Sequence, residues 1–156
     1  MTVNYRLAPL ADIDAVTLYR ILWLRVRVFV VEQRAAYEEL DGRDIEPGAL
    51  LMWAESDGDV IGTLRILTDA SASRIGRVAT SESARGRGVG VELMHRAVAH
   101  CIQAHPELPI DLDAQLHLSA WYARFGFAAS GDEYVEDDIP HVPMRRMPAS
   151  TADGTA

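Results

Sequence analysis

The chain has 156 residues, 49% of them hydrophobic and 24% charged, a balance typical of one folded domain rather than of a disordered or fibrous protein. Its formal net charge is -8, and all 15 basic residues are arginine. The negative charge argues against nucleic acid as a partner, because phosphate-backbone binding needs a positive surface. The absence of lysine excludes a Schiff-base lysine and the lysine of a phosphate-binding P-loop.

The cysteine count and the lengths of the apolar runs limit where the protein is expected to be located and what it is expected to bind. Cys101 is the only cysteine, which excludes an intrachain disulfide and a cysteine-based metal cluster. Residues 1–6 lack the charged and apolar regions of a secretory signal. The most apolar run, residues 21–31, is about half as long as a membrane span and contains two arginines. We therefore expect a cytoplasmic protein with no membrane partner and no bound metal.

The beginning of the chain predicts a strand followed by a helix. Residues 3–8 form the strand candidate, which Pro9 ends. Asp12 is a candidate helix N-cap, because its carboxylate can accept a backbone N–H, and Asp14 would then lie in the first turn. An apolar stripe at helical spacing follows, formed by Leu18, Leu22, Val26, Phe29 and Val30. The β-branched run 26–31 also suits a strand, so the end of this helix stays open.

A turn-rich segment and a hairpin come next. Residues 32–48 predict a loop or an irregular helix. Two apolar, β-leaning runs, 50–55 and 60–67, are separated by Ser-Asp-Gly-Asp, which predicts a β-hairpin. Residues 74–80 predict one more strand, which a glycine-rich loop follows.

The second half of the chain predicts a long helix and then a return to strands. The helix extends to about His105, where Pro106 stops it, and Cys101 lies on its apolar face as a core thiol. The remaining elements are a strand at 110–115, a short helix at 118–124, and two strands around Tyr134 and over 141–146. Small polar residues predict that 148–156 form a disordered tail. This order of elements predicts a single α/β domain built on one mixed sheet.

The glycine-rich loop is Arg85-Gly86-Arg87-Gly88-Val89-Gly90, between a strand and a helix. Glycines let successive backbone N–H groups converge, and the helix N-terminus adds the positive end of its dipole, so the loop suits a phosphate. Val91 stands where a dinucleotide fingerprint needs its third glycine, which excludes that motif. Arginines also outnumber acidic residues over 65–96, which suits a small polyanion. A purely structural turn stays open for a bare glycine repeat.

Two segments carry a family resemblance. Arg85-x-x-Gly88-x-Gly90 resembles the pyrophosphate loop [QR]-x-x-G-x-[GA] of the GNAT family of N-acetyltransferases. Residues 115–127 resemble the family's N-x(6)-Y-x(3)-G-F segment, with Gln115 in place of the usual Asn. The match covers about residues 3–147, and segments 29–33 and 139–141 further resemble the ElaA-like subgroup.

The resemblance implies a fold and a co-substrate. It implies a GNAT-type single domain over residues 1–147, with a mixed, mostly antiparallel central sheet splayed between its fourth and fifth strands and helices on both faces. It implies that acetyl-CoA binds in the splay, where unpaired backbone groups accept the pantetheine amides like a short added strand. The implied cofactor-binding residues are Val78, Ala79, Thr80, Arg85, Gly86, Arg87, Gly88, Val89, Gly90, Gln115 and Tyr122.

The resemblance also implies acetyl transfer to a primary amine of a small molecule or peptide by direct attack. The backbone N–H of Val78 or Ala79 is the candidate oxyanion donor. Tyr122 matches the family tyrosine that protonates the departing thiolate, and its alternative role is packing in the core. Glu32 and His141 are candidate catalytic bases. Further candidates are His117, Glu133 and Glu136, and a water relay without a dedicated base is equally open.

Several alternatives remain at this level. A non-catalytic acyl-CoA-binding or sensing module would carry the same loop, and an enzyme for longer acyl chains would carry the same fold. The acidic residues between 32 and 46 either attract a cationic amine or form a solvated face. The sequence leaves open the acceptor and whether the protein is a monomer or a homodimer.

Overall fold

The computed structural model describes residues 2–149; Met1 and residues 150–156, which make up most of the tail expected to be disordered, lie outside the described residues. The strands are β1 (Asn4–Ala8), β2 (Leu50–Ser56), β3 (Asp59–Thr68), β4 (Ser73–Thr80), β5 (Ile110–Gln115), β6 (Ala128–Ala129), β7 (Tyr134–Glu136) and β8 (Ile139–Arg146). The helices are α1 (Ala15–Val26), α2 (Val89–Ala104) and α3 (Ser119–Ala123), with short helical segments η1 (Leu10–Asp12), η2 (Arg27–Glu32), η3 (Arg43–Ile45), η4 (Glu82–Ala84) and η5 (Leu116–Leu118).

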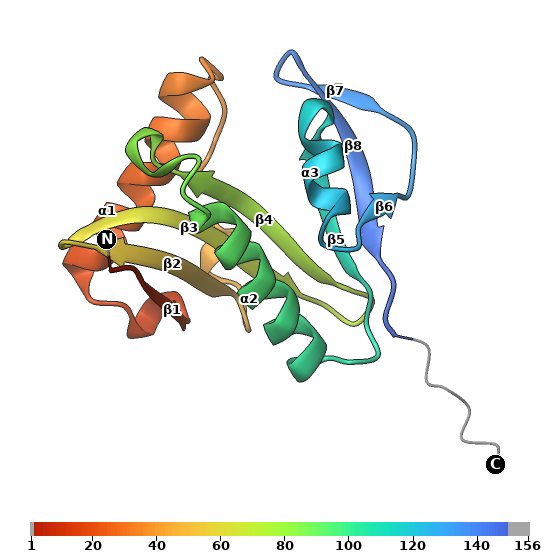
Figure 1. Ribbon diagram of the computed structural model, residues 1–156, viewed down its shortest axis with the longest axis horizontal. Coiled ribbons are helices and arrows are strands. Elements are labelled where there is room, and N and C mark those ends of the chain that lie inside the picture. The colour runs from red at the N-terminus through yellow and green to blue at the C-terminus, as the bar shows by residue number, and fades with distance from the viewer. Residues whose placement is uncertain (1, 150–156) are drawn as a thin grey trace.

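All the described strands belong to one sheet, in the order β1-β2-β3-β4-β5-β8-β6, with β7 paired to β8. Every pairing is antiparallel except that of β4 with β5, which is parallel. Figure 1 shows β1–β4 as one twisted layer and β5–β8 as a second group that leans away from it. The predicted mixed, mostly antiparallel sheet with helices on both faces is confirmed.

The alternation of side chains along β2 explains why helices cover both faces. Met52 and Ala54 belong to the core beneath α2, whereas Leu51 and Trp53 pack with Ile21 and other residues of α1. Because both faces of the central strands are apolar, both must be covered. Figure 1 shows α2 crossing in front of the sheet and α1 lying behind it.

Helix α2 packs very close to β3. A Cβ built on Gly62 would lie 2.8 Å from Val89 Cγ1 and 2.9 Å from Leu93 Cδ1, so only glycine fits there. Cys101 lies 1% exposed on the same face of α2 and is a core thiol, as predicted. Burial raises its pKa to about 11, which keeps the thiol protonated and unreactive.

The start and end of α1 refine two expectations. Asp14, not Asp12, is the N-cap, and its Oδ1 accepts the Thr17 backbone N–H at 3.0 Å; Asp12 lies in η1 instead. The ambiguous run 26–31 is helical, because α1 passes directly into the π-helix η2. Its wider turns carry the helix to Glu32, at the edge of the sheet's opening.

The sheet opens between β4 and β5. These two strands pair only at Ser73 with Ile110 and at Arg74 with Asp111, near the start of each strand. Beyond these pairs β4 keeps its partner β3, and β5 keeps its partner β8. The predicted splay between the fourth and fifth strands is therefore confirmed, and it leaves two facing strand edges without strand partners. Within residues 2–149, no helix is long and apolar enough to cross a membrane.

Candidate active site

A cleft of about 1030 Å³ lies in the opening of the sheet. One wall consists of the end of β4, the glycine loop and the start of α2, together with η2 and the loop after it. The other wall consists of β5, α3 and the β7–β8 hairpin. The lining includes most of the predicted site residues: Glu32, Val78, Ala79, Thr80, Arg85, Gly90, Gln115, Tyr122 and His141. The fold therefore brings together residues from four stretches of the sequence, around Glu32, 78–90, 115–122 and His141.

The glycine loop has the backbone shape that the sequence predicts. Gly86 and Gly88 adopt positive φ values of 76° and 80°, which side-chain-bearing residues rarely adopt. Gly88 is the N-cap of α2 and provides no side-chain cap, so the backbone N–H groups at this helix end can donate to an anion. Val89 contributes backbone only, because its side chain is buried 2% exposed in the core.

The arginines around this loop do not form a free basic patch, which is a correction to the expectation. Arg85 Nη2 contacts Glu32 Oε2 at 2.5 Å, and Arg96 Nε contacts Glu92 Oε1 at 2.7 Å. The carboxylate-paired arginines of the 65–96 segment are Arg65, Arg74, Arg77, Arg85 and Arg96. Most of the positive charge counted in the sequence is therefore neutralised, and backbone geometry is the stronger argument for phosphate.

A β-bulge shapes the end of β4. Thr63 of β3 pairs with Ala79 and Arg65 pairs with Gly76, so Arg77 and Val78 together lie opposite one residue of β3. Arg77 has φ 52°, a left-handed conformation that costs a residue with a side chain of order 1 kcal/mol or more. The bulge lies in the part of β4 that no longer pairs with β5, and Val78 and Ala79, the predicted oxyanion donors, line the cleft there.

Tyr122 lies in the opposite wall, on α3. Its side chain is 8% exposed and packs edge-to-face on Trp121, with ring centroids 4.9 Å apart. Burial raises the pKa of Tyr122 to about 12, so the phenol keeps its proton at any physiological pH. The residue both belongs to the core and reaches the cleft, so the two roles predicted for it are compatible.

Trp121 links Tyr122 to the glycine loop, a contact that the sequence did not indicate. A Cβ built on Gly90 would lie 3.6 Å from the indole of Trp121 and 3.4 Å from Thr80 Oγ1. The loop thus contacts both β4 and α3 across the narrow end of the cleft.

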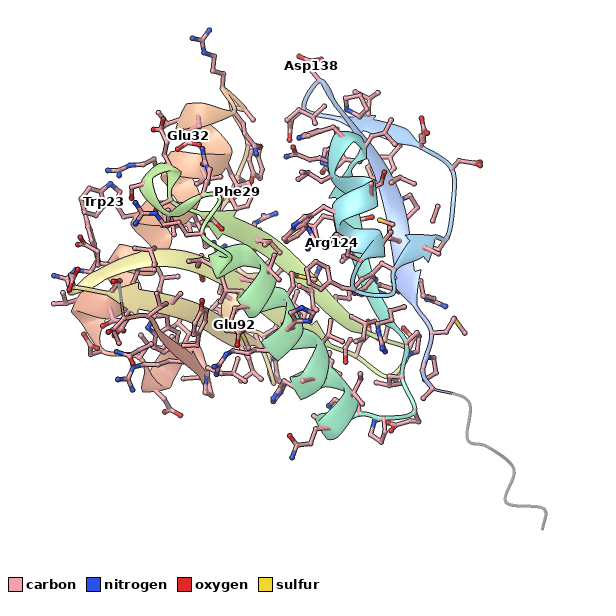
Figure 2. The ribbon with its side chains drawn as sticks, in the orientation of Figure 1. Trp23, Phe29, Glu32, Glu92, Arg124 and Asp138 are labelled. Atoms are coloured by element: carbon pink, nitrogen blue, oxygen red, sulfur yellow. The ribbon has the colours of Figure 1, made fainter. Side chains whose placement is uncertain are left out.

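Glu32 and His141 lie on opposite sides of the cleft. Figure 2 shows Glu32 on the helix beside the glycine loop, whereas Asp138 marks the tip of the β7–β8 hairpin across the gap. The carboxylate of Glu32 is occupied by an ion pair with Arg85. His141 Nδ1 lies 2.7 Å from the Ile139 carbonyl oxygen. Because a carbonyl only accepts, Nδ1 carries the proton and Nε2 keeps its lone pair.

The imidazole of His141 is held in place by its neighbours. It stacks on the ring of Tyr134, with centroids 5.5 Å apart and planes at 18°. Burial raises the pKa of the Tyr134 phenol. The hydrogen bond between its hydroxyl and Asp113 raises this pKa further. Of the other base candidates, His117 and Glu136 line the cleft, and Glu133 is not among the lining residues.

A buried ionic network in the first wall is the largest feature that the sequence analysis missed. Arg25 of α1 is 1% exposed; its Nε donates to Glu39 at 2.7 Å and its Nη1 to Asp44 at 2.6 Å. Arg65 of β3 bonds to Asp41 through two nitrogens, at 2.8 and 3.1 Å. The acidic run is therefore neither an amine-attracting patch nor a solvated face at these positions. One signal was present, because Arg25 directly follows the apolar run 21–24 of α1.

The cleft has the features that an acyl-CoA requires. The α2 N-terminus offers backbone donors for a diphosphate, and the strand edges of β4 and β5 offer backbone groups for amides. The cleft connects these two regions with Tyr122, so the residues present fit the co-substrate. Among residues 2–149 no group of three or more potential metal ligands occurs.

Comparison with known proteins agrees with this geometry. The Acetyltransferase (GNAT) domain family matches residues 15–147. The chain belongs to the GNAT acetyltransferase family. A UPF0039 protein of Mycobacterium bovis is 44% identical over 94% of each chain. Protein ElaA of Escherichia coli is 37% identical over 87% of this chain and 91% of that protein, so the ElaA-like resemblance is confirmed.

Solved GNAT structures share the fold closely. An acyl-CoA N-acyltransferase from Pseudomonas aeruginosa superposes with a TM-score of 0.89 at 40% identity, covering 93% of this chain and 99% of that one. The crystal structure of Escherichia coli ElaA gives a TM-score of 0.89 at 34% identity with the same coverage. The protein thus has the fold of an acyl-CoA-dependent acyltransferase, a family that uses acyl-CoA as co-substrate and acts on amine acceptors.

Proposed function

We propose that this GNAT protein, over residues 1–147, is an N-acetyltransferase that moves the acetyl group of acetyl-CoA to a primary amine of a small molecule or peptide. The observation that carries the proposal is the position of Tyr122 in the same cleft as the open edge of β4 and the start of α2. A site for a diphosphate alone would not need a buried proton donor there. Bound acetyl-CoA would supply a thioester carbon open to direct attack by an amine.

The proposed roles follow from which groups can hold or move a proton. Tyr122, with its pKa raised to about 12 by burial, stays protonated and can give a proton to a strongly basic thiolate. The backbone N–H of Val78 or Ala79, at or next to the bulge, would donate to a developing oxyanion. Thr80, Arg85 to Gly90 and Gln115 would hold the co-substrate, chiefly through backbone groups.

Between the two candidate bases, the contacts favour His141. Its Nε2 is left as an acceptor by the Nδ1–H···O=C bond to Ile139, and the ring faces the cleft. Glu32 must first leave Arg85 before it can accept a proton from an amine. His141→Gln should therefore lower turnover at pH 7 more than Glu32→Gln does, as measured by thiol release. The opposite order would assign the base to Glu32.

Two measurements test the function itself. Acetyl-CoA at about 100 times its dissociation constant should raise the free energy of unfolding by about 2.7 kcal/mol, measured as a thermal shift. Free-thiol release should then be saturable with at least one member of a panel of polyamines, amino acids and peptide N-termini. A non-catalytic sensor would show the thermal shift without thiol release from any amine. An enzyme for longer chains would show stronger stabilisation by longer acyl-CoAs than by acetyl-CoA.

A further inference from the structure

Arg77 combines a left-handed backbone with a multiply held side chain, in a wall of the candidate active site. Its φ of 52° lies at the β4 bulge, one residue before Val78. An arginine adopts this conformation only where surrounding contacts enforce it. Glycine would adopt it freely, so the side chain must contribute something that the turn alone does not need.

The side chain of Arg77 reaches across to the loop that follows η2. Nη2 donates to the Glu39 carbonyl oxygen at 3.1 Å and to Asp41 Oδ2 at 3.2 Å. Nε lies 3.2 Å from Glu39 Oε1, although its N–H direction makes no hydrogen bond there. The guanidinium also lies over the Tyr37 ring, 5.4 Å from its centroid. Four contacts therefore join residues 37–41 to the bulge.

The loop that Arg77 holds is itself part of the cleft. Tyr37, Glu38 and Asp41 are among its lining residues. The same Asp41 binds Arg65 of β3, the residue paired with Gly76 directly before the bulge. Residues 37–41 are thus fastened both to the bulge, through Arg77, and to the β3 residue paired directly before it, through Arg65, so we infer that a movement of the loop would shift the backbone at Val78.

We propose that Arg77 is a positioning residue, which holds the β4 bulge and residues 37–41 in one fixed arrangement so that the backbone at Val78 and the part of the cleft wall formed by residues 37–41 stay aligned. The inference rests on the proposed acetyl transfer for its kinetic consequence. Its structural half, the fastening of residues 37–41 by Arg77, stands independently of any reaction.

The test compares four single variants and one double variant of the full chain. Arg77→Gly keeps the left-handed backbone and removes the side chain, and Arg77→Lys keeps the charge but not the planar fork. Asp41→Asn weakens the other side of the contact. Asp57→Gly is the matched control, because Asp57 also has a left-handed φ, 51°, in the exposed β2–β3 turn. Each variant is measured for kcat, for KM of amine, for calorimetric Kd of acetyl-CoA, and for hydrogen exchange of residues 35–41.

Arg77→Gly should lower kcat on the order of 10- to 100-fold while the Kd of acetyl-CoA stays unchanged, because a small displacement of aligned groups is costly to rate. Exchange at 35–41 should become faster, Arg77→Lys should recover part of the kcat, and Asp57→Gly should match the wild type. In the Arg77→Gly/Asp41→Asn double variant the loss should be smaller than the product of the single losses.

Two results would overturn the inference. One is wild-type kcat in Arg77→Gly; the other is a kcat loss that is matched by weaker acetyl-CoA binding or by unfolding at the assay temperature. If the wild type acetylates no amine, the proposed function fails, and the exchange measurement decides the structural half alone. Faster exchange at 35–41 in Arg77→Gly but not in Asp57→Gly supports the fastening, and equal exchange rejects it.

Discussion

The two ends of the first wall of the cleft are built by different means. The glycine loop and the start of α2 are shaped by backbone: positive φ at Gly86 and Gly88, and a helix end without a side-chain cap. The segment 37–44 is instead held by buried ion pairs to Arg25, Arg65 and Arg77. Backbone shape suits a co-substrate whose phosphates are always the same. Ion pairs fix a segment whose backbone forms little regular secondary structure of its own.

This difference predicts two kinds of sensitivity. The backbone-built end should respond to any residue that needs a negative φ, with a loss of acetyl-CoA affinity. The ion-paired end should respond to loss of a charge, with a loss of folding stability, because an unpaired buried charge is costly. Tyr122, across the cleft from both, should affect rate alone.

The largest expected effect is on rate. Tyr122→Phe should lower kcat by about 10²- to 10⁴-fold, because the thiolate loses its proton donor. The Kd of acetyl-CoA should change little, since the ring still packs on Trp121. Thiol release under saturating substrates measures this, with Tyr5→Phe on β1 as control. Unchanged kcat would leave Tyr122 a core residue only.

The same residue gives a pH prediction. Because burial raises the pKa of Tyr122 to about 12, its acid form persists as pH rises through the physiological range. The alkaline loss of kcat that depends on Tyr122 should therefore appear only near pH 12. A limb at lower pH that disappears in Tyr122→Phe would contradict the assignment.

The next effect is on stability. Arg25→Leu should lower the free energy of unfolding by about 3–5 kcal/mol, because Glu39 and Asp44 stay buried without their arginine. Urea denaturation measures this. Arg96→Ala removes an exposed pair with Glu92 on α2 and should cost under about 0.5 kcal/mol. Similar losses in both variants would remove the contrast between buried and surface pairs.

A smaller effect is expected on affinity. Gly88→Val should weaken acetyl-CoA binding by about tenfold or more, since valine resists the left-handed conformation that the loop needs. A Cβ on Gly88 would meet nothing within 4 Å, so the cost arises from the backbone and not from a clash within the chain. Gly58→Val is the matched control, with the same φ of 80° and equally open surroundings in the β2–β3 turn. If Gly88→Val kept full affinity, the proposal that the phosphates bind at this loop would be wrong.

The smallest effect is the pH dependence of the ion-paired end. Burial raises the pKa of Asp41, but hydrogen bonds from Arg65 and from the Arg43 backbone outweigh it and lower the pKa to about 2. The stabilisation by Asp41 is thus fully present above its unfolded pKa of about 4 and is lost as pH falls toward 2. Asp41→Asn should destabilise the protein at pH 7, and the difference should shrink below pH 4. A constant difference from pH 7 to 3 would show that Asp41 acts by packing.

Sequence reasoning reached the backbone-built end and missed the ion-paired end, for a physical reason. A left-handed turn requires glycine locally, so Gly86 and Gly88 are visible within six residues of sequence. Arg25, Arg65 and Arg77 meet their partners across 14 to 38 residues, and which arginine meets which carboxylate depends on the tertiary fold. For the same reason the sequence counted paired arginines as a basic patch.

Strand and helix boundaries followed local patterns well, apart from the start of α1. Asp12 and Asp14 both suit a cap, and the short segment η1 decides between them. The family signatures located Tyr122 and the loop. Neither signature indicates that Trp121 lies next to Gly90, because this contact depends on how α3 and α2 are arranged in the fold.

Gly62 is not among the cleft-lining residues, yet it fixes how closely the start of α2, the proposed phosphate site, approaches the sheet. With no room for even a methyl group between β3 and the first turns of α2, the helix rests directly on the sheet. The position of its N-terminus relative to β4 is therefore fixed through β3, because the last residues of β4 pair with β3 at Gly62 and Thr63. A larger residue at position 62 would force Val89 and Leu93 of α2 to shift, so we expect a substitution outside the cleft to change how the start of α2 lies relative to the end of β4.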